Sequence, residues 1–123
     1  MSNGLSATQR TLRELRRQGR VCGIVERYLS YAGQFGKRSD LFNIIDIIAL
    51  DPERGVVGVQ SATEHAAHFR KITEEYAQNT KDWLETPGTN LELWVWRKVK
   101  AKRGGKAEIW EPRITEITLE DLQ

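Results

Sequence analysis

The spacing of apolar residues divides the first half of the chain into one helix and two strands. Ser6 and Gln9 form a capping-box pattern that opens a helix, and Gly19 is a typical helix end. Residues 21–28 are rich in β-branched and aromatic side chains, which predicts a strand. Residues 41–50 are apolar on both faces, a pattern typical of a central strand.

The second half continues with a hairpin partner, a helix and a second hairpin. A Pro–Gly turn over 51–55 leads into a strand over 56–60. Apolar residues at helical spacing predict a helix over 64–84. A strand over 91–103 returns through a Gly–Gly turn as a strand over 106–114. The order helix, strand, strand, strand, helix, strand, strand predicts an α/β or α+β fold with a central mixed sheet flanked by helices.

The composition is typical of one globular domain. The chain has 123 residues, of which 39% are hydrophobic and 29% charged, so we expect a single domain with its core over about 6–114 and an acidic tail over 115–123. The single cysteine, Cys22, excludes an intramolecular disulfide. No run approaches the roughly 20 apolar residues of a membrane span, and no signal-peptide pattern opens the chain. We therefore expect a cytoplasmic protein without a membrane partner (in the host cytoplasm, if it is phage-encoded).

The net charge of +2 hides a segregation of charge along the chain. Residues 1–38 carry eight basic and two acidic residues (+6), and residues 39–96 carry four and ten (−6). Residues 97–106 carry six basic residues and no acidic one (+6), and residues 107–123 carry one and five (−4). An acidic centre is therefore bracketed by two basic segments.

The two basic segments are typical of phosphate binding, and Trp94 and Trp96, which precede the second one, could stack on unpaired bases. An alternative is that both tryptophans belong to the core or to a dimer contact, and that the lysines protect a sheet edge from aggregation. We expect DNA as the partner, and the expected contacts are Arg10, Arg13, Arg16, Arg17, Arg20, Lys37, Arg38, Arg97, Lys98, Lys100, Lys102, Arg103 and Lys106.

Asp46 is the strongest candidate for chemistry, because it lies between two pairs of isoleucines. Burying an unpaired carboxylate costs several kcal/mol, so Asp46 is either hydrogen-bonded to a neighbouring loop or a metal ligand or general base. Gln60 follows 14 residues later, and a hairpin brings both side chains to the same end of the sheet. Glu26 and Asp40 lie at strand ends and could complete an oxygen-ligand cluster for Mg²⁺ or Mn²⁺.

This arrangement resembles the core of the PD-(D/E)XK nuclease superfamily, including small phage-type nucleases and Holliday junction resolvases. The residues that carry the resemblance are 38–42, 46–50 and 58–60, and the likeness extends over about residues 8–98. It implies a restriction-endonuclease-like fold of order α-β-β-β-α-β. It also implies Mg²⁺-dependent hydrolysis of phosphodiester bonds in DNA, with branched or phage-replication DNA among the substrates and a homodimer as the assembly for junctions.

The resemblance also assigns roles to individual residues. Asp46 takes the place of the motif Asp, Gln60 stands where Glu is usual, and Glu26 is the acidic residue from earlier in the chain. The motif Lys is replaced by Ala62, so Lys71 or Arg70 in the following helix would supply a migrated positive charge. Three functions stay open: the nuclease, a catalytically inactive DNA-binding module on the same fold, and a protein-interaction or inhibitor module.

Overall fold

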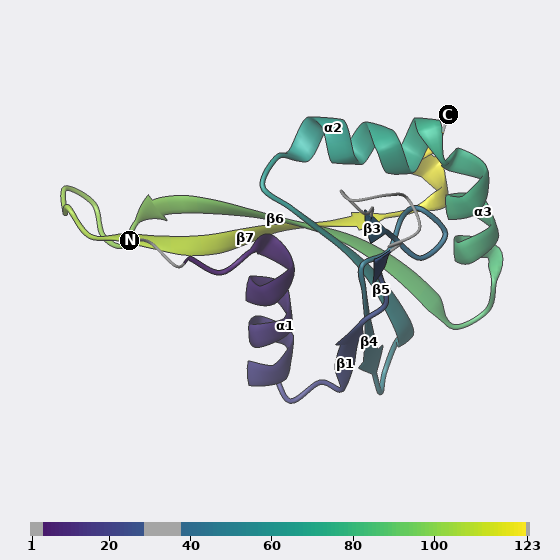
Figure 1. Ribbon diagram of the computed structural model, residues 1–123, viewed down its shortest axis with the longest axis horizontal. Coiled ribbons are helices and arrows are strands. Elements are labelled where there is room, and N and C mark those ends of the chain that lie inside the picture. The colour runs from purple at the N-terminus through teal and green to yellow at the C-terminus, as the bar shows by residue number, and fades with distance from the viewer. Residues whose placement is uncertain (1–3, 29–37, 123) are drawn as a thin grey trace.

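The computed structural model describes residues 4–28 and 38–122 (Figure 1). Its helices and strands follow the order predicted from the sequence, with a small additional pair of strands. The elements are α1 (Ala7–Arg17), β1 (Cys22–Ile24), β2 (Arg27–Tyr28), β3 (Arg38–Ser39), β4 (Ile47–Asp51), β5 (Gly55–Ala62), α2 (His65–Arg70), the π-helix η2 (Lys71–Glu75), α3 (Ala77–Glu85), β6 (Thr89–Lys100), β7 (Glu108–Ile117) and the 3₁₀-helix η3 (Leu119–Asp121).

Five strands form one mixed sheet in the order β1-β4-β5-β6-β7. β4 is antiparallel to β1 and β5, and β7 is antiparallel to β6. β5 and β6 are parallel, because the helical segment α2–η2–α3 connects them as a crossover. The predicted α+β architecture with a central mixed sheet flanked by helices is therefore confirmed.

Helix α1 covers one face of the sheet. Its capping box is present as predicted, since Ser6 Oγ accepts from the Gln9 backbone N–H and Gln9 Oε1 accepts from the Ser6 N–H. Leu12 and Leu15 face the sheet, and they pack on the side chains that alternate strand residues direct to this side. The strand residues of this core layer are Ile47, Ala49, Val57, Val59, Trp94 and Trp96.

The segment α2–η2–α3 covers the opposite face (Figure 1). Its buried Ile72 packs with Leu91, Leu93 and Val95 of β6. Gly58 is needed in β5, because a Cβ at that position would lie 2.6 Å from Cδ1 of Ile45 and 3.1 Å from the Trp83 ring. The sheet is thus the middle of three layers, helix, sheet and helix.

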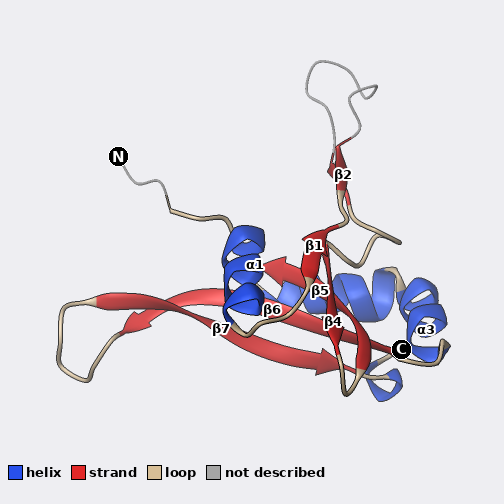
Figure 2. Cartoon of the chain, turned by 90° about the horizontal axis from the view of Figure 1, so that it is seen from below, coloured by secondary structure: helices blue, strands red, loops and turns tan. Residues whose placement is uncertain are grey.

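The β6–β7 hairpin extends beyond the other strands of the sheet, and its turn end projects past α1 (Figures 1 and 2). Trp94 and Trp96 are buried in the part of β6 under α1, and they belong to the core, one of the two roles left open above. Lys98 and Lys100 lie further along the same strand and are exposed. The hairpin therefore has a buried aromatic part under α1 and an exposed basic part towards its turn, which begins at Lys98 and which we call the arm.

Three element boundaries differ from the sequence prediction. Residues 41–45 form a tight turn, so the strand predicted from residue 41 begins only at Ile47. The helix predicted over 64–84 is divided by η2 and by Tyr76, whose backbone leaves the helical region (φ −114°, ψ 36°). Residues 115–117, assigned to the tail from the sequence, belong to β7, and the Ile117 side chain is 1% exposed.

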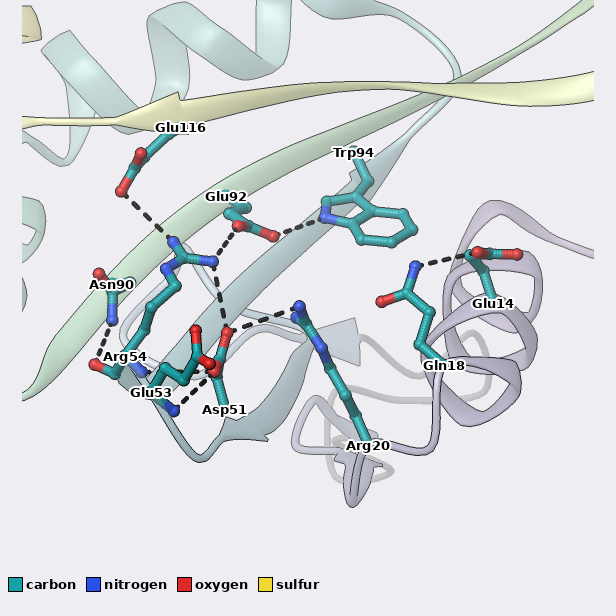
Figure 3. A network of polar contacts seen from close by, with 10 residues as sticks. All are labelled: Glu14, Gln18, Arg20, Asp51, Glu53, Arg54, Asn90, Glu92, Trp94 and Glu116. Carbon is teal, nitrogen blue, oxygen red and sulfur yellow. Dashed lines mark hydrogen bonds and ion pairs between the residues drawn. The ribbon is translucent and has the colours of Figure 1, made fainter.

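An ion network holds the end of the sheet at which β4 turns into β5 (Figure 3). Arg54 lies 2.8 Å from Glu92, 3.3 Å from Glu116 and 3.9 Å from Asp51. Asp51 also lies 3.5 Å from Arg20. This network ties the chain after α1 to β4, β6 and β7, away from the end of β4 at which Asp46 lies.

Among the helices of residues 4–28 and 38–122, none combines the length and the apolar composition that crossing a lipid bilayer requires.

Candidate functional site

The polar site predicted around Asp46 forms at one end of the sheet. Asp46 directly precedes β4, and Gln60 lies near the end of the antiparallel neighbour β5. Both side chains are only 3% exposed, and both leave the sheet on the face that α2–η2–α3 covers. Asp40 reaches the same place from the end of β3, and Lys71 reaches it from the first position of η2. We call Asp40, Asp46, Gln60 and Lys71 the acidic cluster.

Short hydrogen bonds connect the members of the acidic cluster. The Gln60 amide Nε2 donates to Asp46 Oδ1 at 2.7 Å and to Asp40 Oδ2 at 3.1 Å. Lys71 Nζ donates to the same Asp40 oxygen at 3.1 Å and to Gln60 Oε1 at 3.4 Å. One amide group therefore stands between two carboxylates, and the ammonium group lies beside them.

The second Asp46 oxygen, Oδ2, accepts a hydrogen bond from the Ser61 backbone N–H at 3.0 Å. The pKa of Asp46 is raised to about 7, chiefly by burial and with a contribution from the nearby carboxylates of Asp40 and Glu26, against the lowering effect of the Ser61 and Gln60 hydrogen bonds. Asp46 thus changes its charge near neutral pH.

The segment after β5 determines which basic side chain enters the cluster. The sequence left Lys71 and Arg70 as alternatives; Lys71 contacts Asp40 and Gln60, whereas Arg70 is exposed. The change from α2 to the π-helix η2 occurs between these two residues. Ala62 is buried in the apolar core of this face, and the cationic group of the cluster comes from the helix.

Glu26 lies between β1 and β2 and is half-buried, and its charge acts on Asp46. Within the described ranges, no three or more His, Cys, Asp or Glu side chains form a group that could hold a metal ion. The oxygen atoms available in the acidic cluster are thus those of two carboxylates and one amide.

This donor set suits a hard cation. Mg²⁺ binds through one or two carboxylates and retains several waters, and Asp40 and Asp46 supply two carboxylates on one shared hydrogen-bond donor. Rotating the terminal amide of Gln60 exchanges its oxygen and nitrogen, so Gln60 can offer an oxygen where it now offers N–H. A cation in place of that N–H group would stabilise the charged form of Asp46, which burial and, to a smaller extent, the nearby carboxylates disfavour.

A second candidate surface lies where α1 meets the β6–β7 hairpin. The Arg10 guanidinium stands 4.2 Å from the centre of the Trp110 ring, and Lys98 Nζ stands 5.5 Å from the same ring on the other strand. A cavity of about 180 Å³ opens here, and its lining includes Arg13, Arg17 and Trp96. We call Arg10, Arg13, Lys98 and Trp110 the α1–hairpin surface; it combines cations with an aromatic ring.

The other predicted DNA contacts differ in their surroundings. Three arginines have carboxylate partners: Arg17 with Glu14 at 2.6 Å, Arg20 with Asp51, and Arg97 with Glu111 at 3.6 Å. Lys37 and the side chain of Arg38 lie outside the part that the structure describes. The remaining predicted contacts are exposed, and they are Arg16, Lys100, Lys102, Arg103 and Lys106.

Sequence reasoning missed two parts of the site. The Ser61 donor is a backbone group, so its residue type carries no signal for this role; its hydroxyl instead donates to Thr11 Oγ1, which also accepts from Trp96 Nε1. The turn at 41–45 was hidden because its isoleucines extend the apolar run of β4, although Asn43 is a turn-forming residue.

No family model, no curated protein and no solved structure matches this chain.

Proposed function

We propose that this protein is a cytoplasmic endonuclease that hydrolyses phosphodiester bonds in DNA with the help of Mg²⁺ or Mn²⁺. The observation that carries the proposal is the acidic cluster, in which two carboxylates, one amide and one ammonium group converge at one end of the sheet. The chain order also supports the proposal. The resemblance to the PD-(D/E)XK superfamily implies one helix, three strands, a helical segment and a further strand, and α1, the sheet strands β1, β4 and β5, the segment α2–η2–α3 and β6 follow this order.

In this proposal Asp40, Asp46 and the Gln60 amide oxygen hold the cation. When bound, Mg²⁺ would activate a water molecule and offset the charge that develops on the phosphate. Asp46 fits the role of ligand because its carboxylate is fixed by the Ser61 N–H and is buried on a rigid strand end. Asp40, the less buried of the two carboxylates, would approach from the substrate side.

In this proposal Lys71 supplies the positive charge that the motif Lys, replaced here by Ala62, would otherwise provide. Its ammonium group is hydrogen-bonded to Asp40, so it can turn towards a phosphate oxygen without leaving the cluster. The α1–hairpin surface and the exposed lysines of the β6–β7 arm would bind the DNA backbone outside the cluster. Cutting two opposite strands of a four-way junction needs two clusters, so for that substrate we propose a homodimer.

A cleavage assay with matched variants tests the proposal. Linear, nicked and four-way DNA are incubated with the wild type, Asp46→Asn and Glu53→Gln in the presence of Mg²⁺ or Mn²⁺. Glu53 is an exposed carboxylate in the turn at the opposite end of β4, so it controls for the loss of one negative charge. We expect Asp46→Asn to lose at least about 100-fold in rate, an effect of the size seen when a group that stabilises the transition state is removed, and Glu53→Gln to cleave like the wild type.

Lys71→Met and Lys71→Arg extend this assay. We expect Lys71→Met to cleave slowly while binding DNA nearly as well as the wild type, and Lys71→Arg to recover part of the rate. Cleavage that survives Asp46→Asn undiminished would contradict the proposal. DNA binding without cleavage in any divalent ion would instead favour the catalytically inactive DNA-binding module, the reading that Ala62 in place of the motif Lys supports.

A further inference from the structure

Phe42 is a large aromatic residue that is exposed, and it lies in the turn between Asp40 and Asp46, two members of the acidic cluster. Phe42 is 55% exposed, and it lies two positions after Asp40 and four positions before Asp46. The turn that carries it is closed by two backbone hydrogen bonds between Leu41 and Ile45, of 2.7 and 3.0 Å. The Phe42 ring is therefore fixed to the same short segment that places both carboxylates.

The turn holds Phe42 in a backbone conformation that phenylalanine disfavours. Phe42 has φ 54° and Asn43 has φ 65°, and these are the only non-glycine residues with positive φ in the described ranges. Two consecutive positive φ angles are the pattern of a type I′ turn, whose first central position favours Asn, Asp or Gly. Strain of this kind persists where the surroundings impose it, and it clusters at functional sites.

Contacts from α3 impose this conformation. Asn79 Nδ2 donates to the Phe42 carbonyl at 2.9 Å, and the Phe42 and Trp83 rings lie 6.4 Å apart at an angle of 49°. A cavity of about 280 Å³ opens beside this ring pair, and it is lined by Phe42, Asn79, Asp82, Trp83 and Thr86. Two aromatic walls and a rim of amide, carboxylate and hydroxyl groups make a site for a small flat group with polar edges.

The charges of the rim select which part of DNA can enter. The Asp82 carboxylate at the rim repels a phosphate group but accepts hydrogen bonds from the N–H groups that nucleobases carry. Aromatic side chains stack on bases of any sequence, provided that the base is unpaired and has left its helix. A single base is a flat group with polar edges, as this cavity requires.

We infer that the cavity lined by Phe42 and Trp83 binds one unpaired nucleobase of a DNA strand that crosses the acidic cluster. This inference rests on the proposed function for its substrate class, and it deepens that function by naming DNA with an unpaired base, as in bulges, forks or branched structures, as the preferred substrate. The strained turn at Phe42 presents the ring on which that base stacks.

A binding experiment without cleavage tests the inference. Fluorescence anisotropy in EDTA compares three labelled DNAs: a duplex, the same duplex with one unpaired base, and the same duplex with an abasic residue in place of that base. The abasic DNA keeps the distorted backbone but has no base to stack. We expect the wild type to bind the DNA with the unpaired base about tenfold more tightly than the abasic DNA.

Phe42→Asn is the informative variant, because Asn tolerates positive φ and so retains the turn. We expect it to bind the base-containing and abasic DNAs equally, to keep the wild-type affinity for the duplex, and to melt at the same or a higher temperature. Leu50→Asn is the control, since Leu50 is an exposed apolar residue near the other end of β4. Phe42→Leu, which keeps an apolar side chain without an aromatic face, is expected to lose most of the preference.

The outcomes separate this inference from the proposed function. Equal binding of both DNAs by the wild type overturns the inference, while cleavage that depends on Asp46 would still support the nuclease. A preference that persists in Phe42→Asn also overturns it. Absence of binding to all three DNAs would overturn the inference and the proposed function together.

Discussion

Asp46 combines two properties that both disfavour its charged form: it is almost fully buried, and two other carboxylates, those of Asp40 and Glu26, act on it. Its two oxygens accept one backbone and one side-chain hydrogen bond, which keep the group in place but do not neutralise its charge. The ionised form is therefore costly in the protein alone, and a cation bound as proposed in the acidic cluster would make it favourable.

This cost predicts how stability depends on pH. The pKa of Asp46 rises from 3.8 to about 7, so between about pH 4 and pH 7 the folded protein binds one proton more at this site than the unfolded chain. Stability contributed by Asp46 is therefore present at low pH and is lost as the pH rises towards 7. Asp46→Asn removes this loss, and we expect it to be more stable than the wild type at pH 8 by about 4 kcal/mol, since the shift spans about three pKa units and each unit corresponds to about 1.4 kcal/mol.

Urea unfolding at a series of pH values from 4 to 8 measures this effect. The difference between Asp46→Asn and the wild type should be close to zero at pH 4 and should grow to a plateau above pH 7. Glu53→Gln, which alters an exposed carboxylate, should show no such trend. Parallel stability curves for wild type and Asp46→Asn would contradict the raised pKa.

Metal affinity should follow the same ionisation. Because a carboxylate ligand must be deprotonated, Mn²⁺ binding competes with the proton on Asp46. We expect the apparent affinity for Mn²⁺ to increase by up to about tenfold per pH unit below pH 7 and to level off above it. Calorimetric titration in buffers of different ionisation enthalpy would detect the released proton, and a pH-independent affinity would remove Asp46 from the ligand set.

At the scale of elements, the π-helix η2 is the feature that places Lys71. A π-helix widens one turn and leaves carbonyls that need other donors. Thr80 Oγ1 donates to the Ile72 carbonyl at 2.7 Å, and Thr73 Oγ1 donates to the Phe69 carbonyl at 2.7 Å. Both threonines are buried, so these hydroxyls stabilise the widened turn from inside.

Thr80→Val tests this role with an almost isosteric change. Loss of one buried hydroxyl leaves the Ile72 carbonyl without this donor, and we expect a loss of stability of about 1–3 kcal/mol. If η2 then relaxes towards an α-helix, Lys71 shifts away from Asp40, so the cleavage rate should fall more than DNA affinity. Thr86→Val removes an exposed hydroxyl that bonds the Asp82 carbonyl, and it should change stability little. An unchanged rate in folded Thr80→Val would show that the hydroxyl does not position Lys71.

The elements also show which features a sequence reveals. The capping box at Ser6, the hairpin around 51–55 and the alternation of β6 are local patterns, and all three were predictable from residue type and spacing. The late start of β4 was not, because Ile44 and Ile45 extend the apolar run of the strand into the turn. The π-helix was not, because it depends on contacts such as that of the Thr80 hydroxyl with the Ile72 carbonyl, which residue type and spacing do not reveal.

The acidic cluster shows a similar division. The 14-residue interval between Asp46 and Gln60 was enough to predict that they meet, because a tight hairpin has few possible registers. The choice between Lys71 and Arg70 depends on a helix widening by one residue, and the contribution of the Ser61 N–H depends on the backbone. Neither carries a signal in the residue type.

At the scale of the whole molecule, the two ends of β4 have different polar surroundings. The β4–β5 turn end is held by ion pairs of Arg20 and Arg54 with acidic residues (Figure 3). The other end carries the acidic cluster, about 16 Å away along the strand at about 3.3 Å per residue. Charge along the sequence could not distinguish Arg20 from Arg10 as a DNA contact. Arg20 pairs with Asp51 of β4, whereas Arg10 lies over the Trp110 ring of β7, and both partners are distant in sequence.

This difference predicts how individual cations contribute to DNA binding. Each phosphate neutralised by a lysine or arginine adds about 0.9 to the slope of log affinity against log salt concentration. Lys100 is exposed on the projecting hairpin arm, whereas Arg20 lies 3.5 Å from Asp51 at the turn end of the sheet. We therefore expect Lys100→Gln to lower the magnitude of the salt slope by about 0.9 and Arg20→Gln to leave it unchanged, although both remove one positive charge.

Anisotropy titrations of one duplex between 50 and 200 mM salt, roughly the range over which such contacts lose most affinity, measure both slopes under identical conditions. Equal reductions in the two variants would mean that DNA responds only to net charge, and the arm would then have no special role. An effect of Lys100→Gln alone would locate the DNA along the hairpin. It would also show why a chain with a net charge of only +2 can bind a polyanion: several acidic residues lie in the cluster or in ion pairs, while the arm presents exposed lysines.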